Sequence, residues 1–295
     1  MFSLLEVHDV TKKFKNGKGI FNVSFSVKKG EVFGFLGPNG SGKSTTIRHI
    51  MGFMKPDNGY IKVNDLDTWK SQGKVQKYIG YLPGEIAFLE GMTGKGFLDF
   101  IARMQGLDDL SKQKQLIERL RLDVNTPIRK MSKGMKQKVG IVAALMHNPE
   151  VIILDEPTSG LDPLMQRLFI ELMLEEKAKG KTILLSSHSM EEVEKTCDRA
   201  AIIKNGKIVT IKDIHELQSM QRKLFEVTFQ NSADADAFTK SKLDIVFHQK
   251  NVVRVAIQGN FDEFLAETSK YPVRNIDVFT QNLEEIFINY YEGER

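Results

Sequence analysis

The chain has 295 residues, a length that suggests about two domains. Hydrophobic residues make up 41% and charged residues 27%, which is typical of a folded globular protein and excludes a disordered chain, a collagen and a coiled-coil rod. The net charge of +4 is unevenly spread. Residues 221–295 carry more acidic than basic side chains, so the basic excess lies before them and no basic nucleic-acid-binding tail is expected.

The sequence predicts a cytoplasmic location. Apolar runs such as 141–146 and 151–154 are far shorter than the about 18 to 20 residues that a membrane span needs. The single cysteine, Cys197, makes an internal disulfide impossible and fits a reducing compartment. The first ten residues also lack the apolar core of a signal peptide. We therefore expect a chain that cannot form a transmembrane pore by itself.

The first 59 residues predict short strands followed by a helix. Apolar and polar residues alternate from Val23 to Val27, which is the pattern of a strand with one buried face. A further strand is predicted at 32–36. A helix is predicted from Lys43, where apolar residues recur at helical spacing until the turn-forming residues 55–59 end it.

The middle of the chain predicts an α/β core. Residues 85–147 are mostly helical in pattern, and strands are then predicted at 151–154, 182–185 and 201–204, with a helix at 163–178. Asn205-Gly206 favours a tight turn and predicts a β-hairpin. Strands that alternate with helices predict parallel strands, into which a helical segment is inserted.

A domain boundary is predicted at 218–223, where the chain becomes polar. Residues 221–295 then predict the order strand, helix, strand, strand, helix, strand, helix, with the last helix at 283–290. This order resembles a split βαββαβ unit with an added helix. The expected fold class is α/β, with a parallel sheet, an antiparallel β part at the N-terminus, an inserted helical subdomain and a small α+β C-terminal domain.

A phosphate-binding loop is predicted between the strand at 32–36 and the helix that follows. Residues Gly37-Pro38-Asn39-Gly40-Ser41-Gly42-Lys43-Ser44 fit G-x-x-x-x-G-K-[ST] in the strand–loop–helix context that this motif requires. The glycines let backbone N–H groups surround a phosphate, and the helix N-terminus adds positive potential. Lys43 supplies a charge for the outer phosphates, and the Ser44 hydroxyl suits Mg²⁺. Nucleotide kinases, GTPases and transport ATPases all share this loop.

Two further strand ends carry candidate catalytic residues. The strand at 151–154 ends in Asp155 and Glu156, where ligands of α/β sheets bind. Asp155 is placed to hold Mg²⁺, and Glu156, which strand alternation would point to the other side, could polarise the water that attacks the γ-phosphate. His188 follows the strand at 182–185, where its imidazole could contact the γ-phosphate.

These motifs and their order resemble the nucleotide-binding subunits of ATP-binding cassette (ABC) transporters, over about residues 4–215. The matching segments are 37–44 (Walker A), 131–137 (signature), 151–156 (Walker B), 159–162 (D-loop) and His188 (switch histidine). The resemblance implies a P-loop NTPase fold, with an ABC ATPase domain at 1–220 that holds a helical insertion at about 85–147. It also implies ATP and Mg²⁺ as cofactors, Glu156 and His188 as catalytic residues, and Ser44 and Asp155 as metal ligands. The implied ATP-binding residues are Phe14, Gly37, Pro38, Asn39, Gly40, Ser41, Gly42, Lys43, Ser44, Thr45, Ser132, Gly134 and Asp162.

The resemblance further implies a head-to-tail dimer, in which Ser132 and the Gly134 backbone of one subunit meet the γ-phosphate held by the other. Phe14 matches the aromatic residue that stacks on adenine in this family, although a core phenylalanine is the alternative. Two positions depart from the family pattern. Lys133 and Met135 change the signature, and Gly84 stands where a glutamine is expected, so either Glu85 replaces that glutamine or the loop only transmits motion.

The implied function is an ATPase that powers a separate polytopic membrane permease from the cytoplasmic face of the cell membrane. The residues of the signature resemble those of exporters of drugs, peptides or ions. The implied contact surface for the permease lies near 85–105. Residues 221–295 resemble the domain appended in that subgroup, ending in the segment 283–287; packing, dimerisation, regulation and partner contact all stay open for it. A homodimer is mildly favoured over a heterodimer. The alternatives are a soluble ABC-type ATPase of translation or nucleic-acid maintenance, and a nucleotide-gated binding protein that does not hydrolyse ATP.

Overall fold

The computed structural model describes residues 3–220, 223–257 and 261–280, and the chain forms two compact units that divide between Ile214 and His215. Within the described residues every helix is too short or too polar to span a lipid bilayer, and α6 (Pro163–Ala178), the longest, has 16 residues. The predicted helix at 283–290 and its segment 283–287 lie outside the described residues.

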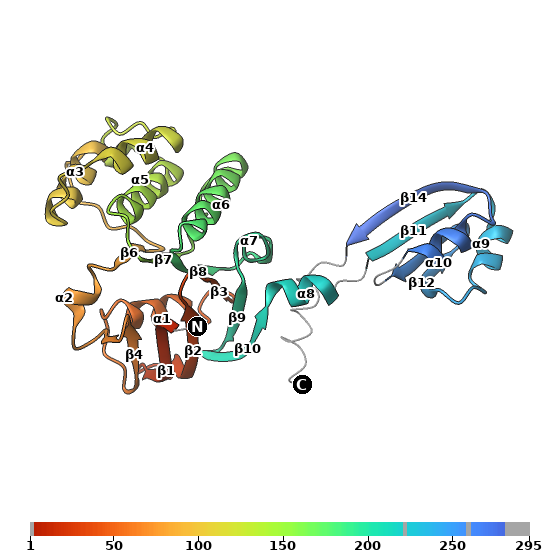
Figure 1. Cartoon of the computed structure of the whole chain (residues 1–295), viewed down its shortest axis with the longest axis horizontal. Helices are drawn as coiled ribbons and strands as arrows, with labels where there is room; N and C mark the ends of the chain where they lie inside the picture. Colours follow the sequence, from red (N-terminus) through yellow and green to blue (C-terminus); the bar gives the residue numbers. More distant parts are fainter. Residues whose placement is uncertain (1–2, 221–222, 258–260, 281–295) are drawn as a thin grey trace. The chain divides into compact units, whose positions relative to one another are not determined.

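The first unit begins with an antiparallel sheet in the order β2-β1-β4-β5, whose strands β2, β1 and β4 can be followed in Figure 1. Its strands are β1 (Ser3–Lys13), β2 (Gly19–Lys28), β4 (Asn58–Val63) and β5 (Leu66–Asp67). The predicted alternation in β2 is present, since Val23 and Val27 are fully buried between more exposed neighbours. The sequence pattern does not predict β4, because the turn-forming residues 58–59 at its start indicate only the end of a helix.

A six-stranded sheet in the order β10-β9-β3-β8-β7-β6 carries the carboxyl ends at which the site is built. Its strands are β3 (Val32–Leu36), β6 (Ile79–Leu82), β7 (Val151–Asp155), β8 (Thr182–Ser187), β9 (Arg199–Lys204) and β10 (Lys207–Asp213). All neighbours pair in parallel except β10, which joins β9 in the predicted hairpin. Every residue of β3, β7 and β8 is buried, as expected for parallel strands covered on both faces.

The helices of the first unit fall into two groups. Three of them lie together, between β6 and β7 in the sequence, and form the inserted helical subdomain (Figure 1). These are α3 (Gly94–Met104), α4 (Ser111–Arg119) and α5 (Lys133–Leu145). The others are α1 (Lys43–Ile50), α2 (Gln72–Val75), α6 and α7 (Met190–Thr196). Helix α1 ends four residues earlier than its apolar pattern predicted, because Gly52 adopts a left-handed φ of 70°.

From residue 215 the second unit continues α8 (Ile214–Met220) and then forms a four-stranded antiparallel sheet in the order β12-β13-β11-β14. Its elements are β11 (Lys223–Phe229), α9 (Ser232–Phe238), β12 (Asp244–Gln249), β13 (Val252–Ile257), α10 (Asp262–Thr268) and β14 (Val273–Thr280). Aromatic residues of β11 and both helices, such as Phe229, Phe238 and Phe264, form its core. The βαββαβ order and the α/β fold class of the first unit are therefore as predicted.

Candidate active site

The loop between β3 and α1 has the backbone of a phosphate-binding loop. Helix α1 begins at Lys43, directly after Gly42, whose φ of 116° is accessible to glycine and rarely to other residues. Gly40 has a φ of 79° and is exposed at the rim of the loop. The first N–H groups of α1 have no helical partners, so this loop presents free donors and the positive end of the helix dipole.

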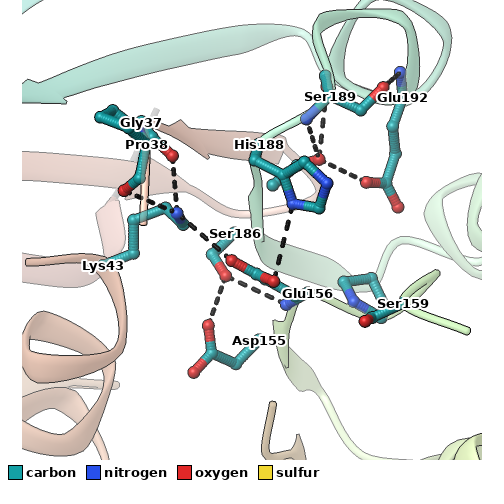
Figure 2. Close-up of polar contacts among 12 residues, drawn as sticks. Gly37, Pro38, Lys43, Asp155, Glu156, Ser159, Ser186, His188, Ser189 and Glu192 are labelled. Atoms are coloured by element: carbon teal, nitrogen blue, oxygen red, sulfur yellow. Dashed lines mark hydrogen bonds and ion pairs between the residues drawn. The ribbon is translucent and has the colours of Figure 1, made fainter. Parts of the chain in front are cut away.

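Lys43 is the buried cation of the loop. Its side chain is 4% exposed, and its Nζ donates to the carbonyl oxygens of Gly37 at 2.6 Å and Pro38 at 3.2 Å (Figure 2). The same Nζ lies 3.3 Å from Oε1 of Glu156. The lysine is thus tied to the loop and to the strand end that carries the two carboxylates.

The two carboxylates are held by the neighbouring strand β8. Asp155 stands opposite Ser186 in the parallel register, and its Oδ1 accepts a short hydrogen bond from the Ser186 hydroxyl. The N–H of Glu156 donates to the same hydroxyl oxygen at 3.1 Å. The prediction placed Glu156 by strand alternation, but this reasoning does not apply, because β7 ends at Asp155 and Glu156 has a left-handed φ of 49°.

His188 contacts the other oxygen of the Glu156 carboxylate. Its Nδ1 lies 3.6 Å from Oε2 of Glu156, while Lys43 contacts Oε1 (Figure 2). The side chain of His188 is 61% exposed and that of Glu156 is 25% exposed. Glu156 therefore stands between a buried cation and an accessible imidazole.

Of the hollows beside these residues, two border the phosphate-binding loop. The first is lined by loop residues, Glu156 and the half-buried ring of Phe14. The second is lined by Ser44, Asp155, Gly84 and Glu85, among others, so it contains both predicted metal ligands. A hydroxyl and a carboxylate are hard oxygen donors of the kind that bind Mg²⁺ together with substrate phosphates. Within the described ranges, no cluster of three or more His, Cys, Asp or Glu side chains offers an all-protein metal site.

The signature segment caps and anchors helix α5. Ser132 is its N-cap and accepts the N–H of Met135 at 3.2 Å. Lys133 donates from Nζ to Oγ of Ser159 at 2.8 Å, and a Cβ added to Gly134 would lie 2.7 Å from the carbonyl oxygen of Gly160. The start of α5 therefore packs closely against the segment that follows Glu156.

Sequence reasoning missed two residues that support the acidic pair. Buried Gln137 donates from Nε2 to the carbonyl oxygen of Pro157 at 2.8 Å, and Ser186 connects Asp155 to Glu156 as described above. Ser186 lies one residue before the end of β8 and opposite Asp155, the last residue of β7, so the pairing of these two strands is the signal that could have found it. Asp162 caps α6 by accepting the N–H of Met165 at 3.0 Å, so its contact with ATP stays a prediction.

Gly84, which stands where the family pattern has a glutamine, lies beside the acidic pair. A Cβ built on Gly84 would lie 3.4 Å from Oδ2 of Asp155. Glu85 is exposed and lines the same hollow, so its carboxylate is close to the site without a described contact to Asp155. Whether Glu85 replaces the glutamine stays a hypothesis.

Comparison with known proteins decides the family. Residues 20–159 match the ABC transporter family. The bacitracin transport ATP-binding protein BcrA of Bacillus licheniformis is 31% identical to this chain, and the alignment covers 99% of both. The chain belongs to the ATP-binding subunits of ABC transporters. As such a subunit it is an ATPase, and subunits of this family dimerise and work with membrane permeases.

Other similar proteins agree with this assignment. The linearmycin resistance ATP-binding protein LnrL of Bacillus subtilis is 33% identical over 97% of both chains. A solved ATP-binding subunit of an ABC transporter is 35% identical with a TM-score of 0.67, over 73% of this ABC subunit and 92% of that chain. These relatives favour a transporter subunit over a soluble ATPase of translation or nucleic-acid maintenance.

Proposed function

We propose that Glu156 is the catalytic base of ATP hydrolysis and that Lys43 and His188 act on its two sides. The observation that carries this assignment is the convergence of Lys43 Nζ and His188 Nδ1 on the two oxygens of one carboxylate. An arriving γ-phosphate would compete with Glu156 for the ammonium of Lys43, because phosphate carries more negative charge than one carboxylate. Released from this pair, Glu156 can accept a proton from the attacking water, while His188 contacts the γ-phosphate.

The rest of the nucleotide would occupy the hollow formed by the loop, residues 37–45, with its adenine against Phe14. Phe14 supports this placement because its ring lines the same hollow as Lys43 and Ser44. Ser44 and Asp155 would hold Mg²⁺, which would neutralise charge on the phosphates. Ser132, Gly134 and Asp162 would meet ATP only across a dimer, most simply a homodimer, since this chain carries every half-site element except the glutamine.

ATP turnover by the purified chain tests the assignment of Glu156. Glu156→Gln keeps the size of the side chain but cannot accept the proton, so we expect kcat to fall at least about 100-fold. Glu191→Gln is the matched control, because Glu191 is an exposed carboxylate that pairs with Lys195 on α7. Phosphate release near the wild-type rate in Glu156→Gln would refute the role of Glu156.

We also propose that the chain drives export of an antibiotic or a similar drug or peptide, from the cytoplasmic face of the membrane. This proposal is supported by two relatives that match over nearly their full length and are named for bacitracin transport and linearmycin resistance. Disruption of the gene should then lower the resistance of the native cells to at least one compound of this kind, and complementation with Glu156→Gln should not restore it.

We propose that the membrane permease contacts the helical subdomain. A hollow lined by Phe88, Leu89, Met92 and Ile128, among others, opens there, and Leu89 is 47% exposed. We expect Leu89→Asp to abolish co-purification of the permease without changing ATP turnover by the isolated chain. Leu174→Asp, at a comparably exposed leucine of α6, is the control. Crosslinks that place the permease only on residues 222–295 would contradict this assignment.

A further inference from the structure

The turn that carries His188 is closed by a relay of hydrogen bonds. The N–H of Ser189 donates to Oγ of Ser187 at 2.9 Å, and the Ser187 hydroxyl donates to Oε2 of Glu192 at 2.5 Å (Figure 2). The N–H of Glu192 in turn donates to Oγ of Ser189, the N-cap of α7, at 3.4 Å. The residues on both sides of His188 are therefore tied to one carboxyl group.

This relay differs from an ordinary helix cap. In a capping box, Ser-x-x-Glu, the glutamate accepts the N–H of the N-cap residue directly. Ser189 and Glu192 have this spacing, but the hydroxyl of Ser187 stands between the carboxyl group and the Ser189 N–H. The added hydroxyl extends the box across His188, from the end of β8 to the start of α7.

Glu192 is buried beyond what helix capping requires. It is 6% exposed, its Oε2 accepts the Ser187 hydroxyl, and the Thr158 side chain is close enough to act on the pKa of the same carboxyl group. Burial, reinforced by the charge of Glu156, raises the pKa of Glu192 to about 7. Burying a carboxyl group costs free energy that a glutamate cap on the surface does not incur, so helix capping alone does not explain this position.

His188 needs support from its backbone. Its side chain is 61% exposed, and its described ion-pair contact is the 3.6 Å approach to Glu156. Such a contact is too weak to hold an exposed ring in one place, since an exposed ion pair contributes about 0 to 1 kcal/mol. The fixed elements near the ring are Ser187 and Ser189, which the relay holds.

We propose that Glu192 is a positioning residue for ATP hydrolysis, which fixes the turn at 187–189 through Ser187 and so keeps His188 against Glu156. This inference rests on the roles proposed above for Glu156 and His188. In this role Glu192 acts through the turn and not on the nucleotide or the attacking water. The neutral amide of glutamine can also accept the Ser187 hydroxyl, so the acceptor is needed and the charge is not.

Kinetics of four variants test the relay. Glu192→Ala and Ser187→Ala should each lower kcat about tenfold with KM for ATP changed less than twofold, because a displaced catalytic group affects chemistry more than binding. The double variant should be no worse than either single one, since both remove the same relay. Glu192→Gln should keep at least half of the wild-type kcat. Glu191→Ala, the exposed neighbour on α7, is the control and should match the wild type.

The NMR signals of the histidine rings test the position of His188 independently of ATP turnover. The chain has six histidines, so the ring signal of His188 can be assigned by its loss in His188→Gln. Glu192→Ala and Ser187→Ala should shift this signal, whereas Glu192→Gln and Glu191→Ala should leave it in place. If Glu192→Ala does not fold, Ser187→Ala and Glu192→Gln still make the comparison.

The possible failures are distinct. A wild-type chain without ATP turnover would refute the proposed function, and the NMR comparison would still decide whether the relay places His188. Lower thermal stability in Glu192→Ala with an unshifted His188 signal would reduce Glu192 to a helix cap and overturn the inference. A tenfold loss of kcat in Glu192→Gln would overturn it as well, because that variant retains the acceptor.

Discussion

Replacing Glu176 with glutamine should destabilise the first unit by much more than the same change at its neighbour Glu175. Glu176 lies on α6 with its side chain 1% exposed. Both of its oxygens accept from Nζ of Lys112 on α4 at 3.1 Å, and Oε1 also accepts from Lys179 at 3.0 Å. The ion pair between Lys112 and Glu176 therefore joins the helical subdomain to the core through a buried carboxylate.

The expected loss of stability follows from how deeply Glu176 and its two lysine partners are buried. Breaking a buried ion pair by removing one charge costs about 3 to 5 kcal/mol. Lys112 is 19% exposed and Lys179 is 54% exposed, so both can regain water, and glutamine can still accept one hydrogen bond. We expect a loss of about 2 kcal/mol for Glu176→Gln. Glu175, which is 45% exposed and pairs with Arg119, should lose less than about 1 kcal/mol.

The pH dependence of this difference has a definite sign. Burial alone would raise the pKa of Glu176, but hydrogen bonds from Lys179 and Lys112 outweigh it and hold the pKa below its ordinary value. A carboxyl group whose pKa is lower in the folded than in the unfolded state stabilises the fold at pH values above its unfolded pKa of about 4.3. This stabilisation is lost as the pH falls through the folded pKa. The stability gap between wild type and Glu176→Gln should therefore be largest at neutral pH and narrow below about pH 4.

Urea unfolding followed by the fluorescence of Trp69 is the assay. Trp69 is the only tryptophan and lies in the first unit, so its signal does not report on the second unit. Equal losses for Glu176→Gln and Glu175→Gln, or a gap that does not change with pH, would refute the reasoning from burial.

Three further changes have expected outcomes. Gly80→Ala should cost about 2 to 3 kcal/mol in urea unfolding, because its Cβ would lie 2.0 Å from a carbonyl oxygen of α5, whereas Gly73→Ala, with open space, should be neutral or slightly stabilising. Gly84→Gln should lower the Mg²⁺ concentration that half-saturates ATP turnover, because its amide would extend beside Asp155; an unchanged titration would exclude this. Burial raises the pKa of Cys197 to about 12, so iodoacetamide at pH 8 should label the native chain far more slowly than the unfolded one, and equal rates would contradict the burial.

Much of the site could be predicted because its chemistry is local in sequence. The loop at 37–44 and the pair Asp155-Glu156 are each continuous segments, so strand, glycine and carboxylate spacing identify them without knowledge of the sheet. Ser186 and Gln137 act through pairing and packing with residues about 20 to 30 positions away. No local pattern gives that register, which is why sequence reasoning missed them.

The strand order and the short elements were beyond local patterns for a related reason. Strand β6 has four residues, too few to show a period, and it is defined by pairing with β7, some 70 residues later. The conformation of Glu156 escapes prediction for a similar reason. Its left-handed φ arises where the chain leaves the sheet after β7, and alternation within a strand cannot predict it. Local spacing identified the residue types, and tertiary contacts decided how their side chains are aimed.

The contacts that join the helical subdomain to the core differ in strength, and this difference suggests which of them yields. Near the site, α5 reaches the segment after Glu156 through an exposed hydrogen bond from Lys133 to Ser159 and a buried one from Gln137 to the carbonyl oxygen of Pro157. Away from it, α4 is held to α6 by the buried carboxylate of Glu176. Because a typical hydrogen bond contributes about 0.5 to 1.5 kcal/mol and breaking a buried ion pair costs about 3 to 5 kcal/mol, motion of α5 relative to Glu156 should pivot about the α4–α6 contact. Glu176→Gln therefore tests the pivot as well as the stability: a coupling between nucleotide and permease that survives its loss unchanged would place the pivot elsewhere.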